Sequence, residues 1–232
     1  MGSKKLRALF IDRDGVINKD PGGWTEHGYV TDWKDFHFLP GALEALRLLS
    51  RAGVKVVVIS NQAGVGKGYF TKEKLERING RMMDAIVKAG GRIEDVYYCI
   101  HRSEDACACR KPKTGLLERA ARKHGIDCAR TYIIGDSLVD VLAGKAMGCR
   151  TIFVRSGKTT VKEARQWSDK PDYVFANLLE AVRWLLAKEE RKADRACHRN
   201  KRKAEVDEED TGHLCDSGDR AQEGGDRGHE GA

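Results

Sequence analysis

The stretch LRALFIDRDG, residues 6–15, decides the fold predicted for this chain of 232 residues. Leu6–Ile11 is mainly apolar and predicts a buried strand. Asp12 and Asp14 follow it, and residues i and i+2 of an extended chain point to the same side, so the two carboxylates converge. They repel each other unless a cation lies between them, and Mg²⁺ favours such oxygen ligands. An isolated pair of this kind is more often a turn aspartate beside a solvated one. The residues that follow the other predicted strands are therefore needed to distinguish a metal site from such a turn.

Short β-branched runs alternate with helical patterns along residues 1–187. The predicted strands are Leu6–Ile11, Val54–Ser60, Val96–Ile100, Tyr132–Gly135, Thr151–Val154 and Tyr173–Phe175. The predicted helices are Gly41–Ala52, a helix from Thr71 to the Gly90-Gly91 break, Gly115–Lys123, 138–147 and 177–187. This alternation indicates an α/β protein with a Rossmann-like, three-layer arrangement, in which helices cover both faces of a parallel sheet. Ligands of such sheets bind beyond the carboxyl ends of the strands.

Polar residues follow the other predicted strands at that edge of the sheet. Ser60 and Asn61 end the second strand, Lys111 lies in the segment after the third, and Asp136 and Asp140 follow the fourth. Together with the first pair of aspartates they supply the parts of a phosphoryl-transfer site. One Asp can attack phosphorus, and a second can protonate the leaving oxygen and then activate water. Mg²⁺, a Lys and a hydroxyl group can hold the remaining phosphate oxygens.

These elements and their order resemble the haloacid dehalogenase (HAD) superfamily of phosphatases, whose signature is DxDG, a strand-ending Ser or Thr, a Lys, and GD with a further Asp. The match covers about residues 5–187. The resemblance implies that Asp12 is the nucleophile and Asp14 the general acid and base. It also implies that Ser60 and Lys111 hold the phosphate.

The same resemblance implies a catalytic Mg²⁺ held by Asp12, the main-chain oxygen of Asp14, and Asp136. Asp140 would support a metal-bound water. The expected enzyme is therefore a Mg²⁺-dependent phosphoric monoester hydrolase that works through an aspartyl-phosphate.

A second candidate metal site lies in YCIHRSEDACACRKP, residues 98–112. Three thiols and one imidazole fall within this segment: Cys99, His101, Cys107 and Cys109. This Cys₃His set is one that Zn²⁺ accepts as a closed, tetrahedral, structural site. Such a zinc would fix the loop and hence the directions of Arg110 and Lys111. The alternatives are a redox pair and cysteines buried by chance.

Loops of the form CxH…CxC resemble those of the small-cap, histidinol-phosphatase-like branch of the superfamily, subclass IIIA. The resemblance implies that this loop partly replaces a cap domain, for which the chain has little room. Two substrates compete within the branch. One is D-glycero-D-manno-heptose 1,7-bisphosphate, hydrolysed at its 7-phosphate, and the other is histidinol phosphate.

Two segments favour the heptose bisphosphate. EHGYV, residues 26–30, resembles a segment that contacts sugar in phosphatases of that compound, which implies that His27 and Tyr29 bind substrate. SNQAGVGKG, residues 60–68, resembles the TNQSGIARG segment of the same group and adds Asn61 and Gln62. Arg110 would recognise the second phosphate, because a guanidinium matches the geometry of phosphate oxygens.

Two features depart from that pattern. Pro21–Trp24 lengthens the segment before His27, and Ser137 occupies a position where the group often has a Lys that contacts substrate. Considered without the resemblance, His27 and Tyr29 are more often loop and packing residues.

Charge and composition divide the chain near residue 188. Residues 1–187 carry 32 Lys/Arg and 22 Asp/Glu, a formal charge of +10, whereas the remaining residues carry 10 and 13. Large apolar side chains are scarce after Leu186, so we expect a folded domain at 1–189 and a disordered, charged tail at 190–232. The basic domain fits an anionic ligand, and it fits ordinary solvated Lys and Arg equally well.

The longest aliphatic run, residues 56–59, is too short to cross a membrane, and no secretory signal precedes Asp12. Seven cysteines, four of them isolated, do not suggest a disulfide framework. We therefore expect a cytoplasmic monomer whose partner is a small anionic sugar phosphate, with no role for a membrane or nucleic acid.

Three other interpretations are weaker. Gly64–Gly68 is not a P-loop, since GxxxxGK[ST] requires a Gly at position 61 and Ser or Thr at 68. The basic run Arg199–Lys203 lacks the aromatic residues or folded module that would support nucleic-acid binding, although a related branch of the superfamily removes 3′-phosphates from DNA. A non-catalytic scaffold would be expected to lose Asp12, which this chain retains.

Overall fold

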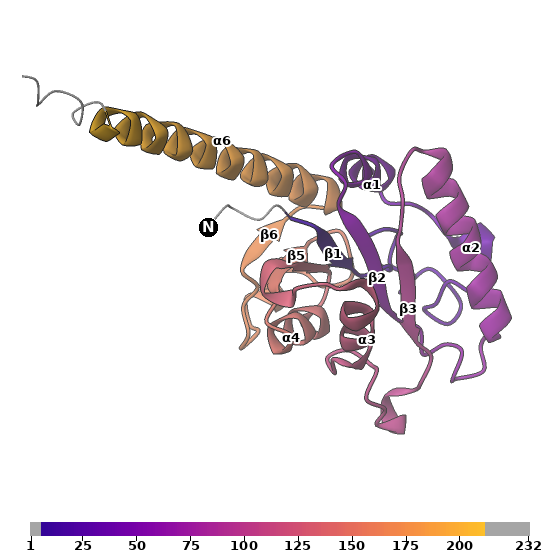
Figure 1. Ribbon diagram of the computed structural model, residues 1–232. Helices are drawn as coiled ribbons and strands as arrows, with labels where there is room; N and C mark the ends of the chain where they lie inside the picture. The colour runs from indigo at the N-terminus through magenta and orange to yellow at the C-terminus, as the bar shows by residue number, and fades with distance from the viewer. Residues whose placement is uncertain (1–5, 212–232) are drawn as a thin grey trace, which may run out of the picture. The chain divides into compact units, whose positions relative to one another are not determined.

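A computed structural model describes residues 6–211 of the chain (Figure 1). Contacts divide the chain after Glu190 into a compact unit, Lys4–Glu190, and a second unit whose described part is residues 191–211. All strands and all candidate site residues of the described chain lie in the first unit. Of the helices within residues 6–211, none combines the length and apolar character needed to cross a membrane.

Six strands of the described chain form one parallel sheet in the order β3-β2-β1-β4-β5-β6. Their bounds are β1 Ala8–Ile11, β2 Lys55–Asn61, β3 Asp95–Cys99, β4 Tyr132–Gly135, β5 Arg150–Val154 and β6 Tyr173–Phe175. Strand order reverses between β1 and β4, and the crevice at such a reversal is where open α/β sheets bind ligands. The topology thus directs attention to the residues that follow these two strands.

Helices cover both faces of the sheet, which gives the predicted three layers. On one face, α1 (Ala42–Arg51), α2 (Lys72–Lys88) and the first turns of α6 (Leu178–Thr211) pack on β1 residues such as Leu9. On the other face, α3 (Gly115–His124) and α4 (Leu138–Ala146) pack on β1 residues such as Phe10. Because successive residues of β1 enter different layers, both faces of the strand are buried.

Several short elements complete the first unit. A one-turn helix, α5, lies between β5 and β6, and three 3₁₀ turns lie in connecting segments; their bounds are Val161–Ala164, Trp33–Asp35, Ser103–Asp105 and Cys128–Arg130. None of these four was predicted, since elements of three or four residues carry too few periodic positions to be recognised.

The register of the sheet aligns the strand ends at one edge. Ile11 of β1 pairs with Val58 of β2 and with Ile134 of β4. The ladder then continues for one more bond, because Asp12 N donates to Ile134 O at 2.9 Å. Asp12 therefore lies directly beside the end of β4.

Two long connections leave from this edge. Residues 12–41 join β1 to α1, and residues 100–114 join β3 to α3. Each contains one 3₁₀ turn, and residues 12–41 also contain two isolated β-bridges, from Asn18 to Asp14 and to Phe38. These loops, and not a large inserted domain, surround the strand ends.

The predicted strands and longer helices are confirmed, to within a few residues at either end except for the C-terminal end of α6. Thr71 caps α2 as expected, its side-chain oxygen accepting from Lys74 N at 3.3 Å.

One predicted boundary is wrong: the helix expected at 177–187 continues to Thr211. Residues 188–211 contain no Gly or Pro and are rich in Lys, Arg, Glu and Ala, which favour helix without tertiary packing. The predicted disorder of 190–232 stays a prediction, and residues 212–232 lie outside the described residues.

Candidate active site

Lys111 is the centre of the candidate site although it lies in a loop. Its Nζ is 2.9 Å from Asp12 Oδ1 and 2.6 Å from Asp140 Oδ1, and it donates to Ile59 O at 2.7 Å. The side chains of Lys111 and Asp140 are each only 1% exposed. One buried cation thus joins groups from the ends of β1 and β2 and from the first turn of α4.

Asn61 fixes the main chain of Lys111. Its Nδ2 donates to Lys111 O at 3.0 Å, and its Oδ1 accepts from Lys111 N at 3.1 Å. Asn61 is the last residue of β2, so this pair of bonds ties the loop to the sheet. A positioning role for Asn61 therefore accompanies the substrate contact predicted for it.

Asp136 follows β4 and is held in a closely packed cradle. Its Oδ2 accepts from Lys158 N at 3.0 Å. A Cβ added at either Gly15 or Gly157 would collide with this carboxylate, and Gly15 also adopts a φ of 79°. The glycine of the DxDG motif is thus required both by its backbone conformation and by the close approach of Asp136.

Asp140 is held by two donors. Ser137 Oγ donates to its Oδ2 at 2.5 Å, while Lys111 occupies Oδ1. The residue that departs from the family pattern, Ser137, therefore supports Asp140.

Three carboxylates lie close together at the carboxyl edge of the sheet, and the pKa values of two of them are raised. Oxygens of Asp12, Asp136 and Asp140 lie within 4.8 Å of one another. Burial raises the pKa of Asp12 to about 7, with Lys111 opposing the shift and Asp140 adding to it. Burial, then the charges of Asp12 and Asp140, raises the pKa of Asp136 to about 8. Burial acts to lower the pKa of Lys111, but Asp12 and Asp140 outweigh it and raise that pKa.

These carboxylates fit a hard divalent cation. Every donor in the group is an oxygen, as Mg²⁺ prefers, and a cation between them would stabilise the ionised carboxylates against the burial and mutual repulsion that raise the pKa values of Asp12 and Asp136. The donor chemistry is unsuited to a soft metal, which selects thiolate ligands.

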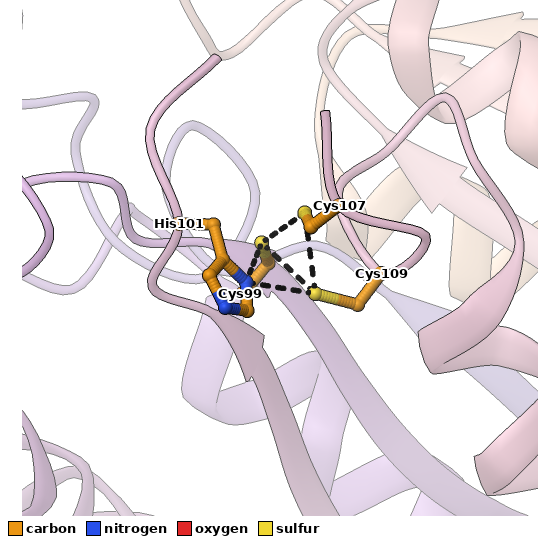
Figure 2. Close-up of side chains that lie close together, drawn as sticks. All are labelled: Cys99, His101, Cys107 and Cys109. Atoms are coloured by element: carbon orange, nitrogen blue, oxygen red, sulfur yellow. Dashed lines mark hydrogen bonds between the residues drawn. The ribbon is translucent and has the colours of Figure 1, made fainter. Parts of the chain in front are cut away.

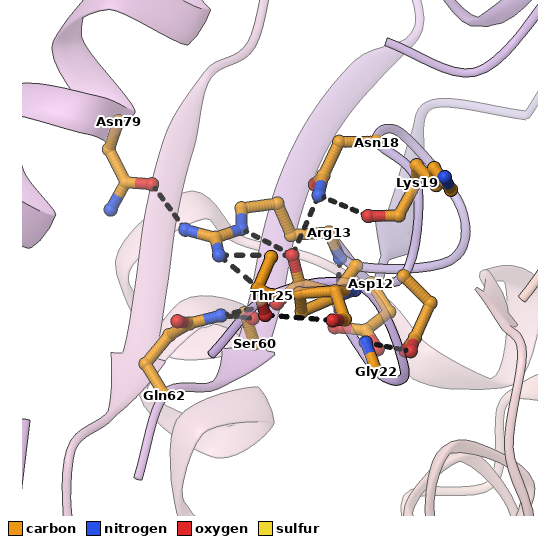
Figure 3. Close-up of polar contacts among 12 residues, drawn as sticks. Asp12, Arg13, Asn18, Lys19, Gly22, Thr25, Ser60, Gln62 and Asn79 are labelled. Atoms are coloured by element: carbon orange, nitrogen blue, oxygen red, sulfur yellow. Dashed lines mark hydrogen bonds and ion pairs between the residues drawn. The ribbon is translucent and has the colours of Figure 1, made fainter. Parts of the chain in front are cut away.

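The carboxylate of Asp14 is held by three side chains. Arg13 Nη2 lies 3.0 Å from both of its oxygens, Asn18 Nδ2 donates to Oδ1 at 2.8 Å, and Gln62 Nε2 donates to Oδ2 at 2.7 Å. In Figure 3, Arg13 and Asn18 come from the connection after β1, and Gln62 comes from the residues after β2. Asp14 nevertheless lines the cavity described below, with 17% of its side chain exposed.

Gln62 connects Asp14 with Ser60. Its Nε2 donates to Ser60 Oγ at 2.9 Å as well as to Asp14, and the residue is fully buried (Figure 3). It is not among the residues that line the cavity. The amide nitrogen of Gln62 is directed at Asp14 and Ser60, whereas its Oε1 is buried and has no hydrogen-bond partner among the described residues. A positioning role for Gln62 therefore accompanies the substrate contact predicted for it, which stays a prediction.

A cavity of about 630 Å³ opens beside these groups. Its lining includes the predicted residues Asp12, Asp14, His27, Tyr29, Ser60, Asn61, Arg110, Lys111 and Asp136. Five cationic residues take part in the lining: Lys67, Arg110, Lys111, Lys113 and Lys158. A cavity of this size and charge suits a small anionic ligand.

His27 and Tyr29 form an aromatic wall of the cavity, and other rings pack against them. The ring of His27 stacks on Tyr69 with 4.3 Å between centroids, and Tyr29 lies 5.8 Å from Tyr69 and 6.4 Å from Phe70. Lys67 Nζ lies 5.7 Å from the ring centre of Tyr29. The segment 26–30 noted in the sequence therefore packs against residues 67–70, which extend the noted segment 60–68.

Arg110 carries a buried donor that the protein does not use. Its Nη1 is buried and has no hydrogen-bond partner among the described residues, while the side chain lines the cavity. A buried N–H group without an acceptor is costly, so Arg110 is suited to an oxygen-rich ligand.

The predicted zinc ligands meet at the end of β3. Figure 2 shows Cys99, His101, Cys107 and Cys109 pointing toward one another. The Sγ atoms lie 3.2–3.5 Å apart, and His101 Nδ1 lies 3.2 Å from Cys109 Sγ and 3.6 Å from Cys99 Sγ. These separations exceed a disulfide bond of about 2 Å. They approach the distance of about 3.8 Å expected between two sulfur ligands of a tetrahedral zinc.

The thiols differ in their surroundings. Burial raises the pKa of Cys99 to about 12. Burial acts in the same direction at Cys107, but hydrogen bonds from Cys109 and Cys99 outweigh it and lower the pKa of Cys107 to about 7. The four donors nevertheless fit Zn²⁺, with His101 presenting Nδ1 to the centre of the cluster.

Sequence reasoning missed four residues that build the site. Arg13 and Asn18 hold Asp14, Asn79 holds Arg13, and Lys158 holds Asp136. Arg13 could have been noticed as a cation between two candidate catalytic aspartates. Asn79 carried no local signal, because it lies in the middle of α2, remote in sequence from every motif.

The sequence and structure were compared with known proteins. The HAD-hydrolase-like family model matches residues 108–181. The D-glycero-β-D-manno-heptose-1,7-bisphosphate 7-phosphatase of Haemophilus ducreyi is 35% identical over 193 residues, which cover 80% of this chain and 100% of the relative. The Helicobacter pylori J99 protein of the same name is 40% identical, covering 77% of this chain and 97% of the relative.

A solved structure is also similar. The D,D-heptose 1,7-bisphosphate phosphatase of B. bronchiseptica, determined with magnesium and phosphate, has a TM-score of 0.72 and 32% identity. The match covers 79% of this chain and 99% of that one.

The fold, with a strand-end DxDG motif, a buried Lys and a further aspartate cluster, is that of a HAD-type phosphatase, a hydrolase of phosphate monoesters. Within that class, the chain belongs to the family of heptose-1,7-bisphosphate 7-phosphatases.

Proposed function

We propose that this protein is a Mg²⁺-dependent phosphatase that removes the 7-phosphate of D-glycero-D-manno-heptose 1,7-bisphosphate. The observation that carries the proposal is the meeting of Asp12, Lys111 and Asp136 in one cavity, whose lining also contains four further cations. The names of the relatives support the choice of substrate.

Asp12 is the proposed nucleophile. Its Oδ1 accepts from Arg13 N at 2.8 Å and from Lys111 Nζ at 2.9 Å, which fixes the carboxylate. A bond from Oδ2 to phosphorus forms as the bond from phosphorus to the sugar oxygen breaks. The product of this step is an aspartyl-phosphate.

Asp14 is the proposed general acid and base. In the first step it gives a proton to the departing sugar oxygen. In the second step it takes a proton from the water that attacks phosphorus, while the bond to Asp12 breaks and inorganic phosphate forms. One water is consumed and Asp14 ends in its starting state.

Ser60 and Lys111 are the proposed holders of the transferred phosphate. Ser60 Oγ accepts from Gln62, so its own hydrogen remains available to a phosphate oxygen. Lys111 supplies a fixed positive charge beside Asp12, where negative charge accumulates during transfer.

Asp12, Asp136 and the main-chain oxygen of Asp14 would hold Mg²⁺. When bound, the metal balances the charge of the phosphate oxygens and of the crowded carboxylates. Both oxygens of Asp140 accept hydrogen bonds, one from Lys111 and one from Ser137. Asp140 therefore acts by holding Lys111 in place.

Cys99, His101, Cys107 and Cys109 would hold a structural Zn²⁺. The set leaves no open coordination position, so its role is to fix the loop that leads into Arg110 and Lys111. The main-chain bonds between Asn61 and Lys111 hold the same loop from the other side.

The rest of the cavity is the proposed sugar and second-phosphate site. Arg110, with its unused Nη1, and Lys67 would bind the second phosphate. His27 and Tyr29 would contact the sugar from the aromatic wall. We further propose that the protein acts as a cytoplasmic monomer.

A panel of phosphate esters tests the substrate assignment. With Mg²⁺ present, kcat/KM should be highest for heptose 1,7-bisphosphate, lower for histidinol phosphate, and lowest for a 3′-phosphorylated oligonucleotide. Arg110→Gln should reduce kcat/KM for the bisphosphate far more than for p-nitrophenyl phosphate. A preference for histidinol phosphate that Arg110→Gln leaves intact would overturn the substrate assignment but leave the phosphatase chemistry standing. Size-exclusion chromatography tests the monomer.

A further inference from the structure

Arg13 lies between the two aspartates of the DxDG motif, yet its side chain is 1% exposed. Its Nε and Nη2 donate to the Asp14 carboxylate at 3.0–3.2 Å, and its Nη1 donates to Asn79 Oδ1 at 3.2 Å (Figure 3). The Phe36 ring centre lies 6.0 Å from Arg13 Cζ. A complete guanidinium is therefore enclosed beside the proposed acid and base.

Stability alone does not account for this arrangement. Desolvation of a buried guanidinium is costly, and apolar residues of similar volume commonly replace a buried ion pair without loss of stability. The pair also uses Asp14, which the reaction requires at the cavity surface. The arrangement is better explained by what it does to Asp14.

The geometry of the contacts restrains the plane of the carboxylate. Two adjacent guanidinium nitrogens reach Asp14, and a fork of this kind fixes orientation as well as distance. Asn79, 6% exposed and rooted in α2, holds the opposite end of the same guanidinium. Arg13 therefore cannot turn without losing a bond at one end.

We propose that Arg13, anchored by Asn79, is a positioning residue that aims the Asp14 carboxylate and thereby sets the rates of both proton transfers. Arg13 reaches the reaction through Asp14 and does not touch substrate. The inference rests on the proposed function in one respect, the acid and base role of Asp14.

Arg13→Met is the first test, with two phosphate esters as probes. Release of an alkoxide from heptose 1,7-bisphosphate needs a proton, so kcat should fall on the order of 10²-fold while KM changes little. The p-nitrophenolate ion leaves without a proton. The initial burst of p-nitrophenolate from p-nitrophenyl phosphate should therefore keep nearly its original rate.

Asn79→Leu tests the anchor. It leaves the ion pair in place but frees the far end of Arg13, so we expect a smaller fall in kcat, about 10-fold, with the burst again preserved. Arg47→Met is the matched control, because it removes a partly buried guanidinium of α1 that has no contact with Asp14 in the described structure. That control should retain full kcat.

A double variant distinguishes an effect of Arg13 on Asp14 from a general disruption of the structure. If Arg13 acts through Asp14, Arg13→Met should add almost nothing to the loss already caused by Asp14→Asn. Additive losses, or a burst slowed as much as turnover, would overturn the inference. If Arg13→Met fails to fold, as judged by circular dichroism, Arg13→Lys and Asn79→Leu carry the same test, since Lys keeps the charge but cannot reach both partners.

Different results would refute the acid and base role of Asp14 and the positioning role of Arg13. Full turnover of the bisphosphate by Asp14→Asn would refute the acid and base role itself. A slow Asp14→Asn enzyme beside normal Arg13→Met and Asn79→Leu enzymes would refute the positioning role alone.

Discussion

The carboxylate cluster and the thiolate cluster each gather ligand atoms within 4.8 Å, but the chain assembles them in different ways. Asp12 lies more than a hundred residues before Asp136 and Asp140 in the sequence, and the three meet because β1 and β4 are neighbours in the sheet. Cys99 to Cys109 lie within one loop. The first site depends on the whole fold, whereas the second depends mainly on a local segment.

The two clusters also differ in burial and in the interactions between their members. The carboxylates are buried and mutually repulsive, and Lys111 is the cation that holds two of them. The thiol cluster is less buried and has only weak hydrogen bonds between its members. We therefore expect each site to be disrupted without destroying the other.

The largest effect should come from Asp12→Asn. An amide cannot form the aspartyl-phosphate, so kcat should fall by on the order of 10⁴-fold or more. Metal analysis should still find one zinc per chain, because Asp12 is not part of the thiol cluster. Loss of zinc in this variant would show that the two sites are not independent.

Cys109→Ser should disrupt the thiol cluster and leave the Mg²⁺ site in place. We expect loss of zinc and a fall of roughly 10²-fold in kcat/KM, because Arg110 and Lys111 would no longer be held in place. Residual turnover of p-nitrophenyl phosphate should remain dependent on Mg²⁺. Cys128→Ser, a cysteine outside the cluster, is the control and should behave as the unaltered protein. Full activity in zinc-free protein would contradict the structural role of the cluster.

The pH dependence of stability should reveal the burial and crowding of the carboxylate cluster. The pKa values of Asp12 and Asp136 rise from 3.8 to about 7 and about 8, chiefly through burial. Between about pH 4 and pH 8 the folded protein holds more protons than the unfolded chain, so its stability falls as pH rises through this window. The fall should be on the order of a few kcal/mol without Mg²⁺ and much smaller with it.

Urea denaturation at pH 5, 6.5 and 8 in Mg²⁺-depleted buffer measures this effect, with zinc left in place. Asp136→Asn is the matched variant, because it removes one of the raised groups and lowers the repulsion on Asp12. An unchanged pH dependence in that variant, or on addition of Mg²⁺, would mean that other groups control the stability.

The smallest effect should follow removal of residues 191–232. All the strands and site residues of the described chain lie within Lys4–Glu190, so kcat/KM and melting temperature should stay nearly unchanged. Activity assays and calorimetry of the shortened chain test this. A large loss of either would show that the C-terminal residues contribute to the phosphatase unit.

The sequence predicted the local features of this protein well. Leu6–Ile11, the DxDG motif and the Cys₃His set are recognisable because strand pattern, residue spacing and ligand chemistry are all contained in short segments. The resemblance of ordered motifs then connected Asp12, Ser60, Lys111 and Asp136 before any contact between them was known.

The sequence could not identify the residues that hold these groups. Gln62 was recognised as a site residue, but a linear motif does not reveal that its amide nitrogen contacts Asp14 and Ser60. The length of α6 was also missed, since helix propensity without burial gives no clear end point. The anchoring of Arg13 by Asn79 could not be recognised, because the two residues are 66 positions apart in the sequence.

By itself, therefore, the sequence determined the α/β architecture, the catalytic motif and the local Cys₃His set. Only the tertiary structure decided that Lys111 links Asp12 to Asp140, that Gln62 lies behind Asp14, and that Arg13 is anchored to α2. The physical reason is that hydrophobic periodicity and ligand spacing are properties of neighbouring residues, whereas burial and hydrogen-bond partners depend on which distant segments the sheet order brings together.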